Sequence, residues 1–248
     1  YPLIHGQGSF GCFTADTEVA LADGRNLSFS ELINEHENGK KNFTFSVDEK
    51  GEVQIAEIKN PRLTKKNAEI MKVFLDNGEE IRCTLNHKFM LKEGSYKEAQ
   101  YLENGDSLMP LYHKLSTTKD SPINPKTIGY TMVFQPRLNT WSFAHRLADQ
   151  WNIDHNIYPK SDGKIRHHID FNKLNNNPTN IQRMNWKEHW KTHYDLTSSK
   201  HKNDPKYRES LAKGRKEFWS DPSNREKSST RLSERNKDNW KNVKYREQ

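Results

Sequence analysis

The sequence contains two groups of residues whose types and spacing could perform chemistry. The first comprises Cys12, which directly follows Gly11, and the pair Thr84 and His87, placed 72 and 75 residues after the cysteine. A thiol can attack the carbonyl of the preceding residue when a nearby hydroxyl and imidazole distort the amide and protonate its nitrogen. Taken singly, a cysteine and a histidine in these places are more often packing residues of a core. Together they predict acyl transfer at the Gly11–Cys12 peptide bond, where the glycine leaves the carbonyl unobstructed.

The second group is the tandem pair His167 and His168, followed by Asn180, His189 and His193. Adjacent side chains on a strand point in opposite directions, so one imidazole can bind a metal while the other takes a proton from water. An asparagine can hold that base, and two histidines four apart on a helix face the same ion. These are the parts that phosphodiester hydrolysis requires. The alternative is a structural zinc site of four histidines, which leaves the Asn-rich loop before the helix unexplained.

Short strands and turns are expected to position the first group. Ser28 and Glu31 form a capping box that predicts a short helix over residues 30–34, and Asn77-Gly78 predicts a tight hairpin turn. The half of the chain before residue 112 is therefore predicted to be all-β. Its expected strands are Thr17–Leu21, Phe43–Val47, Glu52–Ile58, Ile70–Leu75 and Glu79–Thr84.

The pattern changes after residue 112. Two prolines and a cluster of Ser and Thr mark residues 113–127 as a linker or a point of insertion. Helical spacing then predicts a helix over Trp141–Trp151, with Trp141 on the same face as Trp151. A second helix is predicted over Asn185–Tyr194, with Asn185 as its N-cap.

The formal net charge of +7 is distributed unevenly along the chain. Residues 1–127 contain 16 basic and 19 acidic residues, whereas residues 128–248 contain 24 and 14. Thr197–Gln248 alone holds 15 basic and 8 acidic residues, a surplus of 7. A basic module joined to a nearly neutral one favours nucleic acid as a partner.

An imperfect repeat lies within this basic segment. The sequence DPKYRES at Asp204–Ser210 recurs as DPSNREK at Asp221–Lys227 and as NVKYREQ at Asn242–Gln248. One interpretation is a charged, partly disordered tail; the repeat favours instead an arm of small helical units laid along a phosphate backbone. The DNA-binding residues expected on this arm are Lys206, Arg208, Lys213, Arg215, Lys216, Arg225, Lys227, Arg231 and Arg235.

Composition excludes several classes of protein. No run of 18 apolar residues exists, and the first residues lack the basic and apolar regions of a signal peptide, so no membrane partner is expected. Two cysteines in a chain of 248 residues fit a reducing compartment. We expect a cytoplasmic protein of a bacterial or phage-infected cell.

The residues around the first group resemble inteins of the Hint (hedgehog/intein) superfamily. Cys12–Val19 is similar to the opening block of that family, Thr84–His87 to its second block, and Leu102–Asp106 to the close of the amino-terminal splicing region. The resemblance covers about residues 12–112 and implies a β-rich Hint domain. It implies Cys12 as the nucleophile of an N-to-S acyl shift, with Thr84 and His87 on the scissile amide and His87 protonating its nitrogen.

The flanks of this region carry two further expectations. Tyr1–Gly11 resembles a segment of the A subunit of DNA gyrase and related type IIA topoisomerases, which implies a host segment before Cys12. Inteins end in a His-Asn pair followed by Cys, Ser or Thr, and the final residues RNKDNWKNVKYREQ lack that pair. We therefore expect the chain to reach the thioester and to splice only with a carboxy-terminal intein fragment in trans, or to be a truncated product. The third copy of the repeat stops abruptly at Gln248, so we expect the natural chain to continue beyond this residue.

The second group resembles the HNH (ββα-metal) endonuclease motif over roughly residues 165–194. Asn175, Asn176 and Pro178 match the motif besides the histidines. The resemblance implies His168 as general base, Asn180 as the orienting residue, and one divalent metal ion held by His167, His189 and His193. Mg²⁺ or Mn²⁺ is the expected ion, with Zn²⁺ or Ni²⁺ as alternatives, because imidazole ligands also suit these softer ions.

The sequence therefore predicts a multidomain chain with a host segment over residues 1–11, an all-β Hint domain over 12–112 and a linker over 113–127. An α+β HNH domain over 128–196 and an extended helical DNA-binding arm over 197–248 follow. The predicted function is a site-specific homing endonuclease, fused to a splicing region, that cuts double-stranded DNA of an intein-less topoisomerase-like gene. Two alternatives stay open: a nuclease with a relic splicing domain, and a splicing and DNA-binding module with an inactive nuclease.

Overall fold

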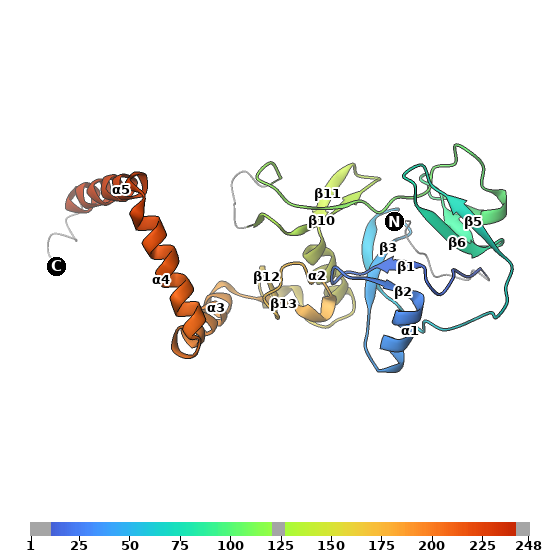
Figure 1. Cartoon of the computed structure of the whole chain (residues 1–248), viewed down its shortest axis with the longest axis horizontal. Coiled ribbons are helices and arrows are strands. Elements are labelled where there is room, and N and C mark those ends of the chain that lie inside the picture. Colours follow the sequence, from blue (N-terminus) through green and yellow to red (C-terminus); the bar gives the residue numbers. More distant parts are fainter. Residues whose placement is uncertain (1–10, 121–126, 242–248) are drawn as a thin grey trace. The chain divides into compact units, whose positions relative to one another are not determined.

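The computed structural model describes residues 11–120 and 127–241, and the chain divides into two compact units, Tyr1–Trp186 and Lys187–Gln248 (Figure 1). The first unit contains every strand of the described residues, and the second is helical. Among the residues described, each helix is too short or too polar to cross a lipid bilayer.

The first unit begins with a small strand pair and a capped helix. β1 (Glu18–Ala20) pairs antiparallel with β2 (Asn26–Ser28), and α1 (Phe29–Glu37) follows directly. The capping box forms as predicted, because the Ser28 hydroxyl accepts from the Glu31 amide while the Glu31 carboxylate accepts from the Ser28 amide. The predicted strand Thr17–Leu21 is confirmed within one residue at each end.

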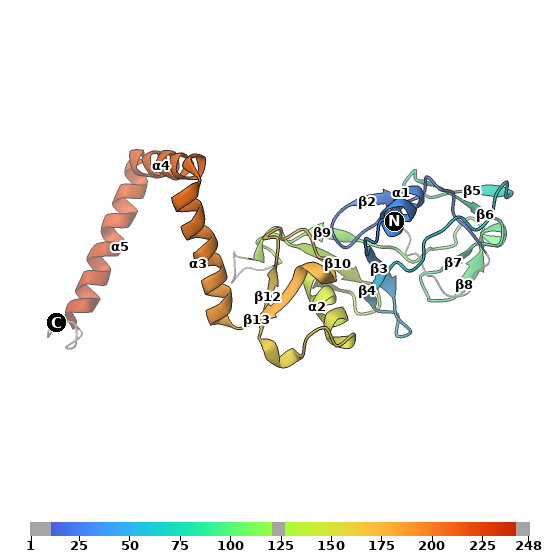
Figure 2. The same ribbon diagram turned by 90° about the horizontal axis from the view of Figure 1, so that it is seen from below.

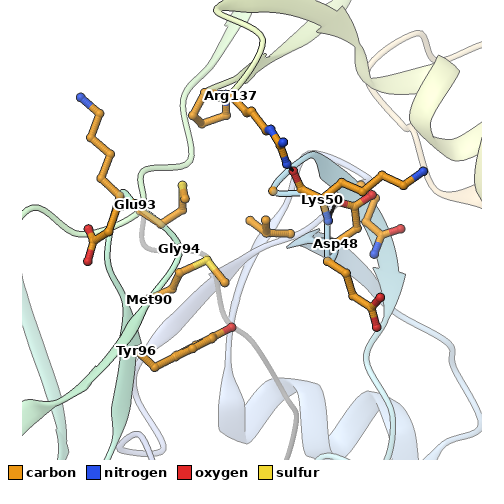
Figure 3. A pocket seen from close by; sticks show the side chains of 14 residues that line it. Asp48, Lys50, Met90, Glu93, Gly94, Tyr96 and Arg137 are labelled. Atoms are coloured by element: carbon orange, nitrogen blue, oxygen red, sulfur yellow. Dashed lines mark hydrogen bonds between the residues drawn. The ribbon is translucent and has the colours of Figure 1, made fainter.

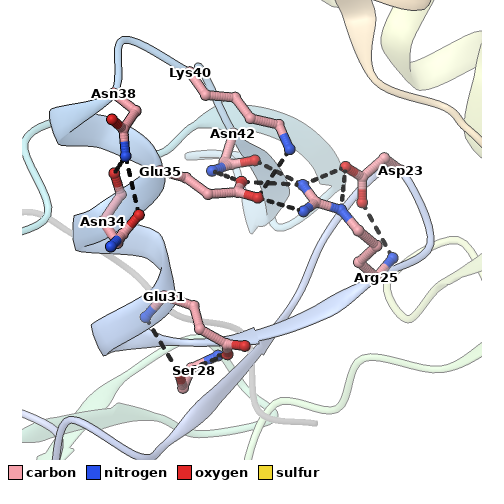
Figure 4. Close-up of polar contacts among 9 residues, drawn as sticks. All are labelled: Asp23, Arg25, Ser28, Glu31, Asn34, Glu35, Asn38, Lys40 and Asn42. Atoms are coloured by element: carbon pink, nitrogen blue, oxygen red, sulfur yellow. Dashed lines mark hydrogen bonds and ion pairs between the residues drawn. The ribbon is translucent and has the colours of Figure 1, made fainter.

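An ion-pair network fixes this corner of the fold (Figure 4). The Arg25 guanidinium donates to Glu35 at 2.7 Å and to Asp23 at 2.9 Å. Asn42 bridges Arg25 and Glu35, because its side chain accepts from the guanidinium and donates to the Glu35 carboxylate. The hydrogen bond from Arg25, with help from Lys40 and Asn42, lowers the pKa of Glu35 to about 2. The network ties the turn before β2 to the far end of α1.

Antiparallel hairpins make up most of the first unit. The predicted hairpin at Asn77-Gly78 forms, as β5 (Ile70–Phe74) with β6 (Glu80–Thr84), and the predicted strands before it pair as β3 (Phe43–Val47) with β4 (Val53–Glu57). The Asn77-Gly78 turn places Gly78 at φ +85°, a conformation that favours glycine. A third hairpin pairs β7 (Lys88–Met90) with β8 (Tyr96–Glu98), and the 3-10 helix η1 (Ala99–Tyr101) follows it.

The second half of this unit contains a three-stranded sheet, a helix and a further hairpin. The sheet has the order β11 (Thr140–Phe143), β10 (Thr131–Gln135), β9 (His113–Leu115). After α2 (Ala144–Asp154) come η3 (Lys160–Asp162), β12 (Ile165–His168), η4 (Pro178–Asn180) and β13 (Ile181–Met184), with β12 and β13 paired.

The predicted helix over Trp141–Trp151 is right in its second half only. Trp141 lies in β11, opposite Phe134 of β10, and the helix begins at Ala144. Ala144 and Ala148 are buried and Trp151 packs on the same cluster, so the expected apolar face exists without Trp141.

One hydrophobic core crosses the expected linker. Phe43 and Ile55 of the amino-terminal strands share a cluster with Val133, Ala148 and Ile181 from the second half. The Gln135 side chain donates to the Val53 carbonyl and accepts from the Val53 amide, both within 2.9 Å. Residues 113–127 therefore do not separate two compact units, and the division that the structure shows lies at Trp186, not at residue 196.

The second unit consists of helices, and Figure 2 shows the sharp bends between them. They are α3 (Trp186–Asn203), α4 (Pro205–Ser220) and α5 (Pro222–Lys241), and none of their described residues is buried. The two Asp-Pro steps of the repeat mark the bends. Proline disfavours helix in the residue before it and suits the first turn of the next helix, and the Asp204 side chain caps the Tyr207 amide at 3.0 Å. The third copy of the repeat, residues 242–248, lies outside the described residues.

Candidate functional site

The Gly11–Cys12 peptide bond lies against the end of strand β6. Phe13 pairs with Cys83 in an isolated antiparallel bridge, and the Thr84 amide donates to the Cys12 carbonyl at 2.9 Å. The Cys12 amide, whose nitrogen is the leaving group of the expected acyl shift, donates to Oγ1 of Thr84 at 2.9 Å. The structure thus brings Cys12 and Thr84 together, with the hydroxyl on the nitrogen of the scissile bond.

His87 also contacts this peptide and is packed between aromatic rings. Its ring centroid is 3.9 Å from that of Phe13 and 5.2 Å from that of Phe89. Burial lowers the pKa of His87 to about 4, and a hydrogen bond to the Gly11 backbone opposes part of that effect. A bond that favours the charged ring is one that the ring donates, so its acceptor is the Gly11 carbonyl oxygen. His87 is therefore a neutral imidazole at pH 7, in contact with the scissile peptide.

Gly11 approaches the backbone of His87 too closely for any side chain. A Cβ placed on Gly11 would lie 2.4 Å from the His87 Cα and 2.8 Å from the His87 nitrogen. From the sequence, glycine at this position was expected only to leave the carbonyl open to attack. The structure adds that glycine allows the scissile peptide to lie directly on the His87 backbone.

The two cysteines differ sharply in environment. Cys83 is fully buried in β6, and burial raises the pKa of its thiol to about 11. Cys12 is half-buried, and its Sγ lies 2.9 Å from Oγ1 of the exposed Thr64. Thr64 lies outside the sequence motifs, and no local pattern distinguishes it, because its contact with Cys12 arises only from folding.

A cavity of about 740 Å³ lies elsewhere in the first unit, between the turns of three hairpins (Figure 3). Charged side chains such as Asp48, Glu93 and Arg137 surround its apolar floor of Met90 and Met109. The Arg137 guanidinium donates to the Lys50 carbonyl. None of the residues predicted to act in chemistry lines this cavity.

The tandem histidines of the second group lie on β12. His167 pairs with Gln182 and His168 with Ile181 across the hairpin, and both are buried. The ring of His167 packs edge-on against Phe171 at 5.0 Å, whereas the ring of His168 lies 5.8 Å from both Tyr130 and His145. The two imidazoles thus have separate surroundings, as the alternation of side chains on a strand predicts.

The orienting contact to His168 comes from a different asparagine than expected. Nε2 of His168 lies 3.3 Å from Oδ1 of Asn176. Asn180 instead donates to the Asp170 carboxylate at 2.8 Å and to the Asn175 carbonyl at 2.9 Å, and its Oδ1 accepts from the Asp170 amide. The expectation that Asn180 holds the base directly is corrected: Asn180 closes the loop, and the loop places Asn176 on the base. Burial lowers the pKa of His168, and the bond to Asn176 opposes that effect.

The remaining predicted metal ligands lie on α3 in the second unit. The ring centroids of His189 and His193 are 4.5 Å apart, as the i, i+4 spacing predicts. Burial and the neighbouring His193 lower the pKa of His189. His167 belongs to the first unit, so a shared ion with these two histidines stays a prediction.

The basic residues expected to contact DNA are all exposed on α4 and α5. Arg208 is also engaged within the unit, since its guanidinium donates to the carbonyls of His201 and Lys202 at the end of α3. Lys213 and Glu217 form an i, i+4 ion pair at 3.9 Å. The other basic residues of the set lie on helices that bury no residue.

Comparison with known proteins identifies the family. The family described as the intein splicing domain matches residues 19–245, and the chain belongs to that family of self-processing proteins. The B subunit of DNA gyrase from Synechocystis sp. (strain ATCC 27184 / PCC 6803 / Kazusa) is 41% identical over 253 residues, which cover 98% of this chain and 23% of that protein. The chain thus spans less than a quarter of the length of this relative. The relative is a gyrase protein, as Tyr1–Gly11 indicated, but it is the B subunit rather than the A subunit.

Two solved inteins are also similar to this chain. A DnaB intein from Synechocystis sp. PCC 6803 is 18% identical with a TM-score of 0.34, covering 54% of this chain and 79% of that one. The G-1F mutant of the Ssp DnaB mini-intein variant M86 is 17% identical with a TM-score of 0.36, covering 51% and 89%.

Proposed function

We propose that this chain cleaves the peptide bond between Gly11 and Cys12 by an N-to-S acyl shift, the first step of protein splicing. The observation that carries the proposal is the 2.9 Å hydrogen bond from the Cys12 amide to Oγ1 of Thr84. His87 forms a hydrogen bond to the Gly11 backbone at the other end of the same peptide group. Both ends of the amide are therefore held by the residue types that the reaction needs.

The chemistry is an isomerisation without a co-reactant. Sγ of Cys12 bonds to the Gly11 carbonyl carbon, the carbon–nitrogen bond breaks, and the thiol proton ends on the Cys12 nitrogen. The hydrogen bond from His87 stabilises negative charge as it develops on the carbonyl oxygen. The Thr84 hydroxyl holds the departing nitrogen by accepting its N–H. His87, which was expected to protonate that nitrogen, is instead assigned to the carbonyl oxygen. The products are a thioester and a free amine in the same molecule.

The host protein and the splicing partner belong to the same proposal. The gyrase relative supports a gyrase-type host protein for Tyr1–Gly11. As the partner in trans we propose a carboxy-terminal intein fragment with a His-Asn pair.

The test is thiol-induced release of an upstream reporter fused before Tyr1. We expect dithiothreitol to release the reporter from the full chain, because a thiol exchanges with the thioester. Cys12→Ala should abolish release, and Thr84→Val should slow it. The buried Cys83 is the matched control, since Cys83→Ala keeps the Cys12 thiol. An intact Gly11–Cys12 bond after prolonged incubation of a folded chain would show that the splicing region is a relic.

We propose as a second activity the metal-dependent hydrolysis of double-stranded DNA by the HNH-like group. The observation that favours it is the buried His168 held by Asn176, with a second imidazole, His167, beside it on the opposite face of β12. Such an arrangement provides a fixed base next to a metal ligand.

His167, His189 and His193 are the residues that would hold the ion. Only four residues lie between Met184, the last of β13, and His189, so the length of the chain itself limits the distance between the hairpin and the first turn of α3. All three donors are imidazoles, which suit Mn²⁺, Ni²⁺ and Zn²⁺ and bind Mg²⁺ poorly. The ion would supply a Lewis acid for the phosphate, and His168 would take the proton from the attacking water.

The test is cleavage of a gyrase-type gene that lacks the intein, with each divalent ion added separately. We expect His168→Ala to abolish cleavage while DNA binding persists. His36→Ala is the matched control, because His36 is exposed on α1. Asn176→Ala should reduce cleavage by loss of orientation of His168. A wild-type chain that binds this DNA but never cuts it would support the alternative of an inactive nuclease.

A further inference from the structure

The attacking sulfur of Cys12 has a hydrogen-bonding partner outside the splicing motifs. Oγ1 of Thr64 lies 2.9 Å from Sγ of Cys12, and the two residues are 52 positions apart in the sequence. Thr64 lies between β4 and β5, in a stretch of the chain without strand or helix. The contact joins one side chain to another, so it depends on the hydroxyl of Thr64 and not on its backbone.

We propose that Thr64 is a further catalytic residue of the acyl shift, and that its hydroxyl holds the Cys12 sulfur and stabilises the negative charge that develops on it. The inference rests on the proposed reaction at Gly11–Cys12. It assigns to Thr64 a role distinct from those of Thr84 and His87, which contact the amide and not the thiol.

A hydroxyl suits both states of the sulfur. The hydroxyl oxygen can accept from the thiol S–H, and the hydroxyl hydrogen can donate to the sulfur once the proton has left. A hydrogen bond to a charged acceptor is roughly twice as strong as one between neutral groups. The contact with Thr64 therefore strengthens as the sulfur becomes nucleophilic, and it confines the sulfur to one position.

With Thr64 included, each atom that changes its bonding has a fixed partner. Thr84 holds the nitrogen of the scissile bond, His87 holds the Gly11 oxygen, and Thr64 holds the sulfur. Cys83 cannot substitute as a nucleophile, because it is fully buried and opposite Met71 in the hairpin.

The expected size of the effect is modest because Thr64 is exposed and water competes for both groups. Loss of one hydrogen bond of this kind changes a rate by roughly three- to tenfold. The effect should be much smaller than that of removing Cys12, and it should appear in any reaction of this sulfur.

The experiment compares Thr64→Val, which removes the hydroxyl and keeps the shape, with Thr64→Ser, which keeps the hydroxyl. Thr118→Val is the matched control, since Thr118 is an exposed threonine in another turn of the same unit. Two rates are measured for the full chain at one pH: alkylation of Cys12 by iodoacetamide, followed by peptide mass spectrometry, and thiol-induced reporter release. Circular dichroism confirms that each variant is folded.

We expect Thr64→Val to slow both rates by about three- to tenfold and Thr64→Ser to restore both, with Thr118→Val unchanged. Alkylation at the wild-type rate in Thr64→Val, or no rescue by Thr64→Ser, overturns the inference. If the wild-type chain releases no reporter, the acyl shift itself fails. Alkylation then still shows whether Thr64 acts on the sulfur, so the two failures are distinguishable.

Discussion

Replacing Gly11 with alanine tests how closely the scissile peptide must lie against His87. The new Cβ would lie 2.4 Å from the His87 Cα, whereas ordinary contacts begin at 3.4 Å, so the two backbones must separate by about 1 Å. His87 cannot easily yield, because its amide donates to the Thr84 carbonyl and its carbonyl accepts from the Ala99 amide. The Gly11–Cys12 peptide is therefore the part that moves.

This displacement should be costly to the reaction and harmless to the fold. A misplacement of about 1 Å in a reacting group lowers a rate by about 100-fold, which corresponds to about 2.7 kcal/mol in the barrier. The substitution removes none of the reacting groups, since the Cys12 thiol, Thr84 and His87 are all retained. The loss would thus come from geometry alone.

The assay is reporter release by dithiothreitol, with the rate measured for wild-type and Gly11→Ala chains at the same pH. Gly214→Ala is the matched control, because a Cβ at that helical glycine meets no atom within 4 Å. The thermal melt of Gly11→Ala should superimpose on that of the wild type, and Gly214→Ala should be no less stable, because alanine favours the interior of α4. Release from Gly11→Ala within twofold of the wild-type rate would refute the argument that the contact with His87 positions the amide.

Three further predictions concern stability and DNA binding. Burial lowers the pKa of His87 from 6.5 to about 4, so between these two pH values the unfolded chain binds a proton that the folded chain does not. The contribution of His87 to the free energy of unfolding is therefore complete above pH 6.5 and is lost as the pH falls toward 4. We expect a loss of about 2 kcal/mol at pH 5, measured by urea unfolding, and a shallower pH dependence in His87→Gln. Asp149→Ala should destabilise the first unit by about 3–5 kcal/mol in the same assay, because it leaves the buried Arg183 without the carboxylate that lies 2.7 Å away. The control is the exposed ion pair of Asp238 and Lys241, where Asp238→Ala should lower the free energy of unfolding by less than about 0.5 kcal/mol. Deleting residues 204–248 should weaken DNA binding and flatten its dependence on salt concentration, and an unchanged salt slope would contradict the proposed role of the basic helices.

Features that depend on neighbours in sequence were predicted best. The capping box of Ser28 and Glu31 and the Asn77-Gly78 turn formed as expected, because each is decided within a few residues. Trp141 was assigned to a helix on its spacing alone, yet it pairs with Phe134 across β10 and β11. Pairing with a preceding strand is not visible in a helical period, which explains the error.

The candidate site was predicted in its residue types but not in all of its contacts. Thr84 ends β6 and His87 follows three residues later, and the bridge between Phe13 and Cys83 brings Cys12 against them. Thr64 and Asn176 could not be singled out, since one lies in a stretch without a motif and the other is one of several asparagines in a loop. Asp170 decides between the asparagines: its carboxylate engages Asn180 and Asn175, which leaves Asn176 for His168.

The shared core changes how the two proposed activities relate to each other. Gln135 is buried and completes the hydrogen bonding of Val53, and Trp151 packs edge-on against Phe43 with ring centroids 4.9 Å apart. Removing residues 128–186 would expose the apolar side chains of Phe43 and Ile55 to water and remove the Gln135 side chain that pairs with the Val53 amide and carbonyl. The strands that carry the peptide chemistry and the hairpin that carries the tandem histidines therefore belong to one cooperative unit. A substitution in the second half, such as Asp149→Ala, should weaken both activities through stability, whereas Thr64→Val should affect only the reactions of Cys12.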